Sequence, residues 1–505
     1  MIDQMISGML SIFDLNVLPF IFLGLPVGLL FGLLPGLSGV TTLAILMPFI
    51  YGMEPVKALA FLLGAWSVCN NGGTVTAILL NIPGDTANAA TMLDGYPMTQ
   101  KGLAGRALGN ALSASAFGAL FGGLVLIVLI FVARPLIMAF GLPEFFFLIF
   151  LGLCFIAVLG SESPIKGFIS GGMGIALSFF GISVLTGEPR FTFGSLRLLD
   201  GFDIVPIGLG VFAMPEVVEL VISRGGTIAK VDKSNVSSAQ MWEGTKDIFR
   251  HFKLFLLSSG IGTFIGIVPG VGGNVAPWVA YGVAKQISKH PEKFGTGCVE
   301  GVIAPEASNN GKEGGALLTT LALGIPGSAG MALLLGAFLM VGLDPGPMFL
   351  KEHLDLAFSM ASTLIFANFL GTGVMMALSK KLSAISYIRG SMLGPIILVL
   401  CVFGAYCASN DLWDIPFFFI FGALGVVMKA YHYNRAALFL GFVLGVMAEK
   451  YFGLSLSTYG PLFFLRPISL AIIATTVLVL FYNKFRVALS GKKYMKEANP
   501  RLEER

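Results

Sequence analysis

The chain has 505 residues, of which 55% are hydrophobic and 12% are charged, and its formal net charge is +4. Soluble domains carry roughly 25% charged residues, so this composition excludes a soluble enzyme, a nucleic-acid-binding protein and a disulfide scaffold. It predicts a polytopic helical membrane protein.

Eleven apolar runs are long enough to cross a bilayer, which takes about 20 residues in a helix. They are continuous rather than alternating with period two, so we expect helices and not a barrel. Two further apolar regions, about 38–98 and 272–343, are interrupted by Gly, Pro and Asn and do not resolve into simple spans. The clear runs lie at 17–34, 108–132, 144–160, 165–185, 203–222, 252–268, 354–378, 391–408, 413–430, 435–452 and 463–482.

The placement of Lys and Arg predicts how the chain is oriented in the membrane. None precedes Lys57, whereas the segments 223–253 and 484–505 are rich in both. We therefore expect a periplasmic N-terminal segment at 1–16, a cytoplasmic linker at 223–253 and a basic cytoplasmic tail at 484–505. Termini on opposite sides of the membrane require an odd number of crossings, so we expect 11 or 13.

The chain contains three Gly-rich motifs twice, in the same order. In the first half they are GLLPGLSG at 32–39, NNGG at 70–73 and NIPGDTA at 81–87. In the second half they are GIVPGVGG at 266–273, NNGKEGG at 309–315 and GIPGSAG at 324–330. Such ordered repetition rarely arises by chance.

The predicted orientation gives the two copies opposite senses in the membrane. The span that ends at Pro35–Gly36 runs inward, and the span that ends at Pro269–Gly270 runs outward. We therefore predict an all-α polytopic membrane protein of two inverted-topology repeats with broken or re-entrant helices. The first transmembrane repeat covers 17–222, and the second covers 254–483 together with additional C-terminal helices.

Each motif is expected to break a helix within the membrane, because proline removes a backbone donor and glycine permits unusual conformations. The freed N–H and C=O groups persist only where protein or a wet cavity satisfies them. Carbonyls at a helix C-terminus suit a sodium ion, and amides at a half-helix N-terminus suit a carboxylate. The motifs therefore predict a two-fold site for substrate and coupling ion, with Na⁺ bound transiently at the same places. Its candidate residues are Pro35, Gly36, Ser38, Gly39, Asn70, Asn71, Gly72, Gly73, Thr74, Pro83, Gly84, Asp85, Pro269, Gly270, Gly272, Gly273, Asn274, Asn309, Asn310, Gly311, Gly314, Gly315, Pro326, Gly327 and Ser328.

Other interpretations of these residues stay open. Small residues in membrane helices often serve only close helix packing, which we prefer for isolated cases such as Gly122–Gly123 but not for the duplicated set. Lys312 and Glu313 form a self-neutralising pair, lie in a water-exposed loop, or handle substrate or protons. Asp85 assists a cation or caps a helix start.

Over roughly residues 20–480 the chain resembles the large membrane subunit (TctA) of the tripartite tricarboxylate transporter family. The segments that carry the resemblance are GLLPGLSGVTTLAILMPF, NNGGTVTAILLNIPGD, DGYPMTQKGLAGRAL, GTFIGIVPGVGG and APEASNNGKEGGALLTTLALGIPGSAGMALLLGAF. The family's duplicated signature falls on Pro35–Gly39, Asn70–Thr74, Pro83–Thr86, Pro269–Asn274, Asn309–Gly315 and Pro326–Ser328.

The resemblance implies a secondary transporter of the bacterial inner membrane that carries carboxylates and is driven by a cation gradient. With the inverted set of helix breaks, it leads us to expect import of small organic di- or tricarboxylates by symport with Na⁺ or H⁺ through alternating access. It also implies a small four-helix membrane subunit and a periplasmic solute-binding protein as partners, with no cofactor besides the coupling ion. A passive carboxylate channel or a scaffold for another complex is the alternative. An intramembrane enzyme has little support, because no nucleophile with a base or metal cluster stands out. The sequence leaves open which carboxylate is carried, which ion is coupled, the oligomeric state, and whether the motion is of the elevator or rocking kind.

Overall fold

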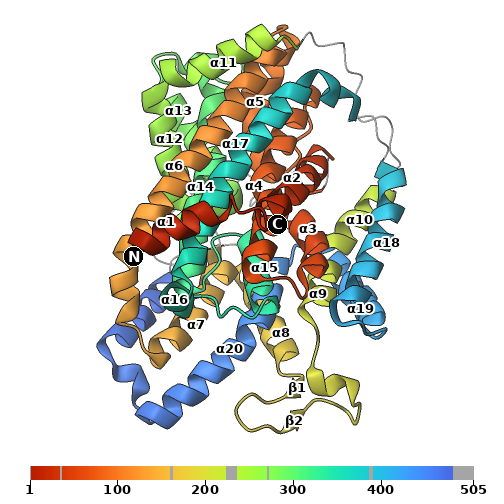
Figure 1. The fold of residues 1–505 in the computed structure, drawn as a ribbon, viewed down its shortest axis with the longest axis vertical. Coiled ribbons are helices and arrows are strands. Elements are labelled where there is room, and N and C mark those ends of the chain that lie inside the picture. Colours follow the sequence, from red (N-terminus) through yellow and green to blue (C-terminus); the bar gives the residue numbers. More distant parts are fainter. Residues whose placement is uncertain are drawn as a thin grey trace, which may run out of the picture.

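The computed structural model describes residues 2–34, 37–159, 163–222, 236–269, 272–385 and 390–480, and its secondary structure is almost entirely helical (Figure 1). Within those residues, the strands form one short antiparallel pair, β1 (Gly181–Ile182) with β2 (Pro189–Arg190). By length and composition, four helices could cross a membrane. The chain is therefore an all-α membrane protein, as predicted.

The first half contains a run of helices interrupted by short turns. In chain order they are α1 (Ile2–Ser11), α2 (Leu18–Leu33), α3 (Gly39–Leu46), η1 (Met47–Ile50), α4 (Pro55–Leu80), η2 (Thr86–Asn88), α5 (Ala89–Gln100), α6 (Ala104–Met138), α7 (Leu142–Leu159), α8 (Pro164–Ser178), η3 (Arg197–Asp200), α9 (Ile204–Gly208), the π-helical turn η4 (Leu209–Ala213) and α10 (Met214–Ile222).

The second half begins with a similar succession. Its elements are α11 (Ser238–Arg250), α12 (Phe252–Ile267), α13 (Gly272–Ile287), η5 (Pro291–Lys293), α14 (Glu300–Leu323), α15 (Ala329–Met340), α16 (Pro347–Glu352), α17 (Leu354–Ile385), α18 (Gly390–Ser409), α19 (Asp414–Ala430), α20 (Arg435–Tyr459), η6 (Phe463–Leu465) and a helix at Pro467–Leu480.

The predicted apolar runs coincide with helices, with one exception at an end. The run at 165–185 is helical only as far as Ser178, after which the chain turns into the β1–β2 hairpin. The two interrupted regions resolve into α3, α4 and α5 in the first half and α13, α14 and α15 in the second. The number of membrane crossings and the side on which each terminus lies stay predictions.

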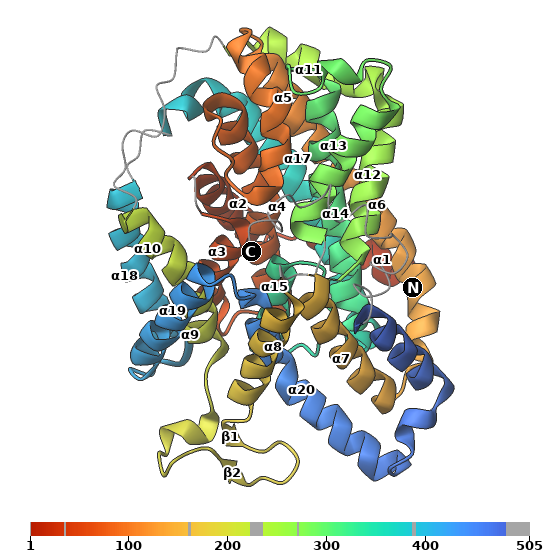
Figure 2. The ribbon, with the colours of Figure 1, turned by 180° about the vertical axis from the view of Figure 1, so that it is seen from behind.

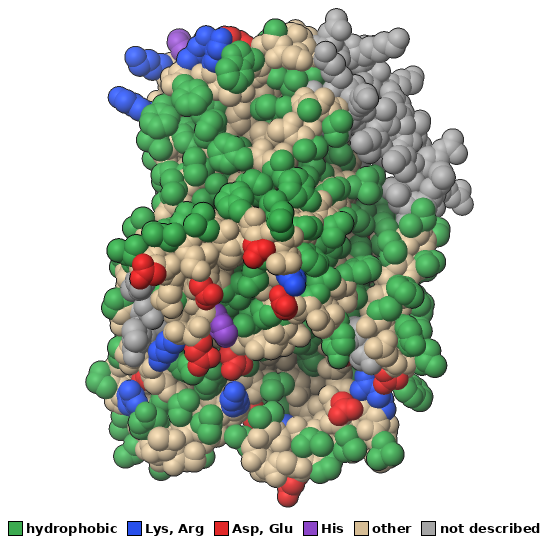
Figure 3. All heavy atoms as spheres, viewed as in Figure 1, with side chains coloured by type: hydrophobic (Ala, Val, Ile, Leu, Met, Phe, Trp, Pro, Cys, Tyr) green, Lys and Arg blue, Asp and Glu red, His purple; other side chains and the backbone are tan. Residues whose placement is uncertain are grey.

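Two groups of helices lie side by side in the molecule. The larger group contains α2, α4, α5, α6, α12, α13, α14 and α17, and the smaller group contains α9, α10, α18 and α19 (Figure 2). Hydrophobic side chains cover much of the face in Figure 3, while Lys and Arg gather at its upper edge near α11. Among the described residues, large hydrophobic side chains such as Phe264 (71%) and Val132 (66%) are exposed, as expected of a surface that faces lipid.

The same order of elements occurs twice along the chain. In each copy an amphipathic helix (α1; α11) precedes a helix that ends at a Pro-Gly motif (α2; α12). A shorter helix (α3; α13), a long helix carrying NNG (α4; α14) and a helix after the IPG motif (α5; α15) follow. A long helix (α6; α17) closes each copy and packs against the central helix of the other, α6 against α14 and α17 against α4.

Candidate functional site

The Pro-Gly motifs interrupt the helices as predicted. In the first copy, α2 stops before the motif and α3 begins at Gly39, with the Ser38 side chain accepting a hydrogen bond from the Thr41 N–H (3.3 Å). In the second copy, α13 begins at Gly272 after a similar interruption. Among the predicted residues, Pro269 follows the end of α12, Pro35, Gly36 and Gly270 lie outside the described residues, and the side chains of Gly272, Gly273 and Asn274 are not described.

The two IPG motifs also interrupt the chain. Asn81 (φ 59°) ends α4 and Gly324 (φ 68°) ends α14, both in the left-handed conformation that commonly closes a helix. Asp85 then caps η2 by accepting from the Thr86 N–H (2.6 Å), and Ser328 caps α15 by accepting from the Met331 N–H (3.3 Å). The capping role considered for Asp85 is therefore present. The intervening residues are Pro83, Gly84, Pro326 and Gly327.

The prediction that the NNG motifs break their helices is wrong. Asn70–Thr74 lies inside the continuous helix α4, and Asn309–Gly315 lies inside the continuous helix α14. Glycine costs up to about 1 kcal/mol in a helix, but close approach of a neighbouring backbone offsets that cost.

The glycines of the NNG motifs each meet a neighbouring backbone. A Cβ added to Gly72 would lie 2.7 Å from the Gly32 backbone of α2, and one added to Gly314 would lie 2.1 Å from the Gly122 carbonyl oxygen of α6. These glycines therefore serve helix packing. The same close approach occurs at Gly73 with Gly84, Gly311 with Ser259, and Gly315 with Thr263.

The asparagines of the two NNG motifs meet in the interior of the protein. The Asn310 side-chain amide donates to the Asn71 side-chain oxygen (3.2 Å) and to that of Asn368 on α17 (2.6 Å), and the Asn71 amide lies 3.4 Å from the Thr372 hydroxyl. All four side chains are buried. The structure thus brings together the predicted residues Asn71 and Asn310 from opposite halves.

The helices α4 and α14 run in opposite directions where they cross at these asparagines. Trp66, before Asn71 in α4, donates from its indole N–H to Glu313, after Asn310 in α14 (2.9 Å). Thr74, later in α4, donates to Glu306, earlier in α14 (2.9 Å). This antiparallel crossing agrees with the inversion of the two copies that the sequence predicts.

Lys312 and Glu313 form a buried pair rather than lying in a water-exposed loop. The two residues are 4% and 3% exposed, and the Lys312 Nζ lies 3.5 Å from the Glu313 Oε1. Lys312 also donates to the Asn309 side-chain oxygen, while Glu313 accepts from Trp66. The pair therefore neutralises itself inside the crossing of α4 and α14.

Two helix N-termini meet at the Trp66 ring. A Cβ added to Gly39, at the start of α3, would lie 2.8 Å from the ring, and one added to Gly330, at the start of α15, would lie 2.0 Å from it. The capping serines Ser38 and Ser328 stand directly before these helices, and α3 packs against α15. The partial positive ends of both helices therefore converge next to the crossing, where they favour an anion.

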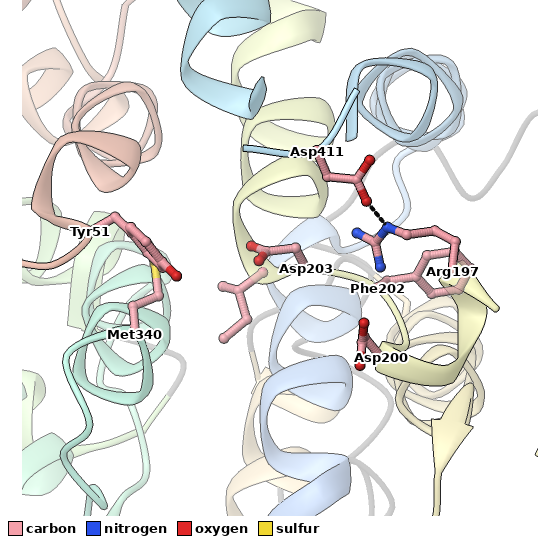
Figure 4. Close-up of a pocket in the computed structure, with 8 residues that line it drawn as sticks. Tyr51, Arg197, Asp200, Phe202, Asp203, Met340 and Asp411 are labelled. Carbon is pink, nitrogen blue, oxygen red and sulfur yellow. Dashed lines mark ion pairs between the residues drawn. The ribbon is translucent and has the colours of Figure 1, made fainter. Parts of the chain in front are cut away.

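A cavity of about 420 Å³ lies at the other ends of the same helices (Figure 4). Tyr51, after η1, and Met340, the last residue of α15, form one wall, while Asp200 and Asp203 lie on the opposite side. Arg197 in this cavity is already paired with Asp411 and Asp414. Helix C-termini and carboxylates disfavour an anion, whereas the N-terminal ends of α3 and α15 favour one.

A second ionic cluster fastens α11 to α6, apart from the crossing. Arg106 donates two hydrogen bonds to the buried carboxylate of Asp247 (2.6 and 2.9 Å), and Arg250 donates a third (2.9 Å). Burial raises the pKa of Asp247, but the bonds from the two guanidinium groups outweigh it and hold the pKa below its ordinary value of 3.8. The cluster keeps the Asp247 carboxyl group ionised and holds α11 against α6.

Sequence reasoning missed several residues at the crossing. Trp66, Asn88, Glu306, Asn368 and Thr372 make hydrogen bonds there but belong to no predicted set. One signal was present for Glu306, which precedes Asn310 by four residues and so shares its helix face. The other four residues lie outside the repeated motifs, and nothing in the sequence pointed to them.

Comparisons with known proteins agree with the resemblance seen in the sequence. The family model described as "Tripartite tricarboxylate transporter TctA family" matches residues 18–440. An Agrobacterium vitis protein described as "Uncharacterized 52.8 kDa protein in TAR-I ttuC' 3'region" is 34% identical over 437 residues, which cover 85% of each chain. A second protein of that organism, "Uncharacterized protein in TAR-II ttuC' 3'region", is 34% identical over 193 residues, 38% of this chain and 78% of that protein. No solved structure matches.

Proposed function

The chain belongs to the tripartite tricarboxylate transporter TctA family, and from this premise we propose that it imports small organic di- or tricarboxylates by cation symport through alternating access. It acts as the large membrane subunit of a binding-protein-dependent system in the bacterial inner membrane. A small four-helix membrane subunit and a periplasmic solute-binding protein complete the system. Its N-terminus lies in the periplasm and its C-terminus in the cytoplasm.

The observation that carries this proposal is the convergence of two helix N-termini at Trp66. The first N–H groups of a helix have no carbonyl partner within it, and α3 and α15 both begin beside the Trp66 ring, with Ser38 and Ser328 as their capping residues. Such ends bind carboxylates without a fixed positive charge. In this structure the nearby Lys312 is engaged by Asn309 and Glu313, so the anion is held by dipoles that can also release it.

The duplicated architecture supports alternating access. The copies lie antiparallel at the crossing of α4 and α14, which is the arrangement of secondary transporters that carry cargo at a repeat interface. The coupling cation binds near the same interrupted helices, where the carbonyl ends of α2 and α12 can receive Na⁺ transiently or a carboxyl group can receive H⁺. Movement of one helix group against the other then exposes the site to each side in turn.

Transport into liposomes tests the proposal. The full-length chain, purified with its partner subunits, should accumulate a labelled carboxylate from a panel of citrate, succinate and malate under an inward Na⁺ or H⁺ gradient. Ser38→Ala and Ser328→Ala should weaken the concentration dependence of uptake, because each removes a hydroxyl at the anion site. Ser237→Ala is the matched control, since Ser237 caps α11 in the same way (3.3 Å to the Ala239 N–H) far from the crossing.

Two results would count against this function. Uptake that equilibrates but never exceeds the outside concentration under either gradient would indicate a passive channel. Equal effects of all three serine variants would show that the serines near Trp66 act only as helix caps.

A further inference from the structure

A carboxylate outside every predicted set occupies the interior beside the crossing. Glu306 of α14 is fully buried, and its oxygens accept hydrogen bonds from three hydroxyl groups, those of Thr74 (2.9 and 3.0 Å), Thr91 (2.6 Å) and Ser115 (2.7 Å). The hydroxyls belong to α4, α5 and α6, so one side chain of the second copy joins three helices of the first.

Most other buried carboxylates among the described residues have a basic partner. Glu144, Glu216, Asp247, Glu313 and Asp414 each lie within 4.0 Å of a Lys or Arg nitrogen. Glu306 and Asp94 have no such ion pair in the part of the chain that the structure describes.

The two exceptions are held by different kinds of groups. Asp94 accepts from the Tyr281 hydroxyl and from the backbone N–H groups of Gly295, Gly297 and Cys298 (2.7 to 3.0 Å). Backbone N–H groups can only donate, so they suit an ionised carboxylate alone. Hydroxyl groups can donate or accept, so the shell of Glu306 suits both its ionised and its protonated form.

The charged groups on the helices around Glu306 are bonded to other partners, so they do not hold Glu306 in its ionised form. On its own helix, Lys312 is engaged by Asn309 and Glu313. On α5, Asp94 is bonded as described, and on α6, Arg106 is paired with Asp247. Near Thr74, α4 contributes the Cys69 thiol, which lies 3.6 Å from the Thr42 hydroxyl.

The oxygen–oxygen distances at Glu306 are those of direct hydrogen bonds. The carboxylate lies 2.6 Å from the Thr91 hydroxyl and 2.7 Å from the Ser115 hydroxyl, both typical of an O–H···O bond.

We propose that Glu306 is the group that binds the coupled proton, an inference that rests on the proposed symport. A proton from periplasmic water forms an O–H bond with one carboxylate oxygen, and one of the surrounding hydroxyls turns to accept from it. On the cytoplasmic side that O–H bond breaks and the proton returns to water. Because the carboxyl group is sealed from solvent here, the proton exchanges only when α14 moves relative to α4, α5 and α6, and this links proton transfer to the motion.

Infrared difference spectroscopy between acidic and alkaline pH tests the assignment directly on the purified complex. The wild type should show the C=O band of a protonated carboxylic acid, which Glu306→Gln should remove. Asp94→Asn, the matched control on a neighbouring helix, should keep the band. In liposomes, Glu306→Gln should retain exchange of labelled for unlabelled carboxylate, because glutamine mimics the protonated form, but lose accumulation driven by a pH gradient.

The outcomes separate this inference from the proposed function. Survival of the infrared band in Glu306→Gln, or undiminished pH-driven accumulation by that variant, would overturn the assignment, as would accumulation that responds to Na⁺ gradients alone. If the wild type exchanges substrate but accumulates it under neither gradient, the proposed symport is wrong. Loss of the infrared band in Glu306→Gln would then by itself show whether Glu306 binds a proton.

If Glu306→Gln does not fold, variants of its hydroxyl partners test the assignment instead. Thr91→Val and Ser115→Ala each remove one hydroxyl that bonds the carboxylate. Each variant should shift the pH at which the infrared band is half formed by about half to one pH unit. An unchanged midpoint in both variants would overturn the assignment.

Discussion

The first copy of the repeated unit, α1 to α6, and the second, α11 to α17, share their backbone plan down to single close contacts. Gly8 of α1 packs on the Asp355 carbonyl of α17, and Gly244 of α11 packs on the Arg106 carbonyl of α6 in the same way. At the crossing, however, the copies differ in charge. The first contributes Asn, Thr and Trp, whereas the second contributes Glu306, Lys312 and Glu313.

This difference shows which features the repeat must keep and which it can change. Interrupted helices and backbone packing recur in both copies, as the proposed alternating exposure of one site requires. At the crossing, ionisable groups occur in only one copy, because two facing sets of buried charges would have to be neutralised separately. In the proposed mechanism the shared backbone plan serves the movement, and the ionisable residues that only the second copy carries at the crossing serve ion binding.

The largest expected effect comes from the charges that only the second copy carries. Lys312→Met should destabilise the protein by about 3–5 kcal/mol, because it leaves the buried Glu313 without its ion pair. The double variant Lys312→Met/Glu313→Gln should recover part of that loss. Thermal unfolding in detergent measures both, and equal losses in the single and double variants would show that the pair is not coupled.

The packing glycines should respond alike in both copies. Gly72→Ala and Gly314→Ala each place a Cβ against a neighbouring backbone, and overpacking typically costs about 1–3 kcal/mol. Gly260→Ala in α12 is the control, since a Cβ there meets nothing within 4 Å and should stabilise by up to about 1 kcal/mol. If the two tight positions tolerate alanine as Gly260 does, the close packing of α4 on α2 and of α14 on α6 is incorrect.

The amphipathic helix of the second copy, α11, should make the stability of the protein depend on pH through Asp247. Asp247 has a lowered pKa in the folded protein, so its contribution to stability is complete above its ordinary pKa of 3.8 and is lost as the pH falls through the lowered value. Asp247→Asn should therefore destabilise by about 1–3 kcal/mol at neutral pH and progressively less below pH 3.8. Unfolding of both proteins across pH measures the gap, which a constant difference at all pH values would contradict.

The smallest effect is expected at the caps that follow the two IPG motifs. Ser328 caps the twelve-residue helix α15, whereas Asp85 caps the three-residue turn η2. Ser328→Ala should cost about 1 kcal/mol, and Asp85→Ala should cost less because the turn behind it is short. A larger loss at Asp85 in the same unfolding measurement would instead indicate a role in cation binding.

Much of this arrangement could be predicted from sequence, because it depends on local chemistry. Long apolar runs predicted the helices, a Pro-Gly motif predicted the interruption before Gly39, and an IPG motif predicted the one after Leu323. The continuity of α4 and α14 through their glycines could not be predicted in this way, because it depends on the backbones of α2 and α6. Glu306 escaped detection for the same reason, since its three hydroxyl partners lie 191 to 232 residues away in the chain.

The central claim is that the N-terminal ends of α3 and α15 form a carboxylate site open to each side of the membrane in turn. Ser328→Cys, in a chain whose five native cysteines are replaced, can be labelled in oriented vesicles by an impermeant thiol reagent from either side. The account predicts labelling from both sides under opposite gradients, slowed by the transported carboxylate. Labelling from one side only, or at a rate that citrate, succinate and malate leave unchanged, would contradict it.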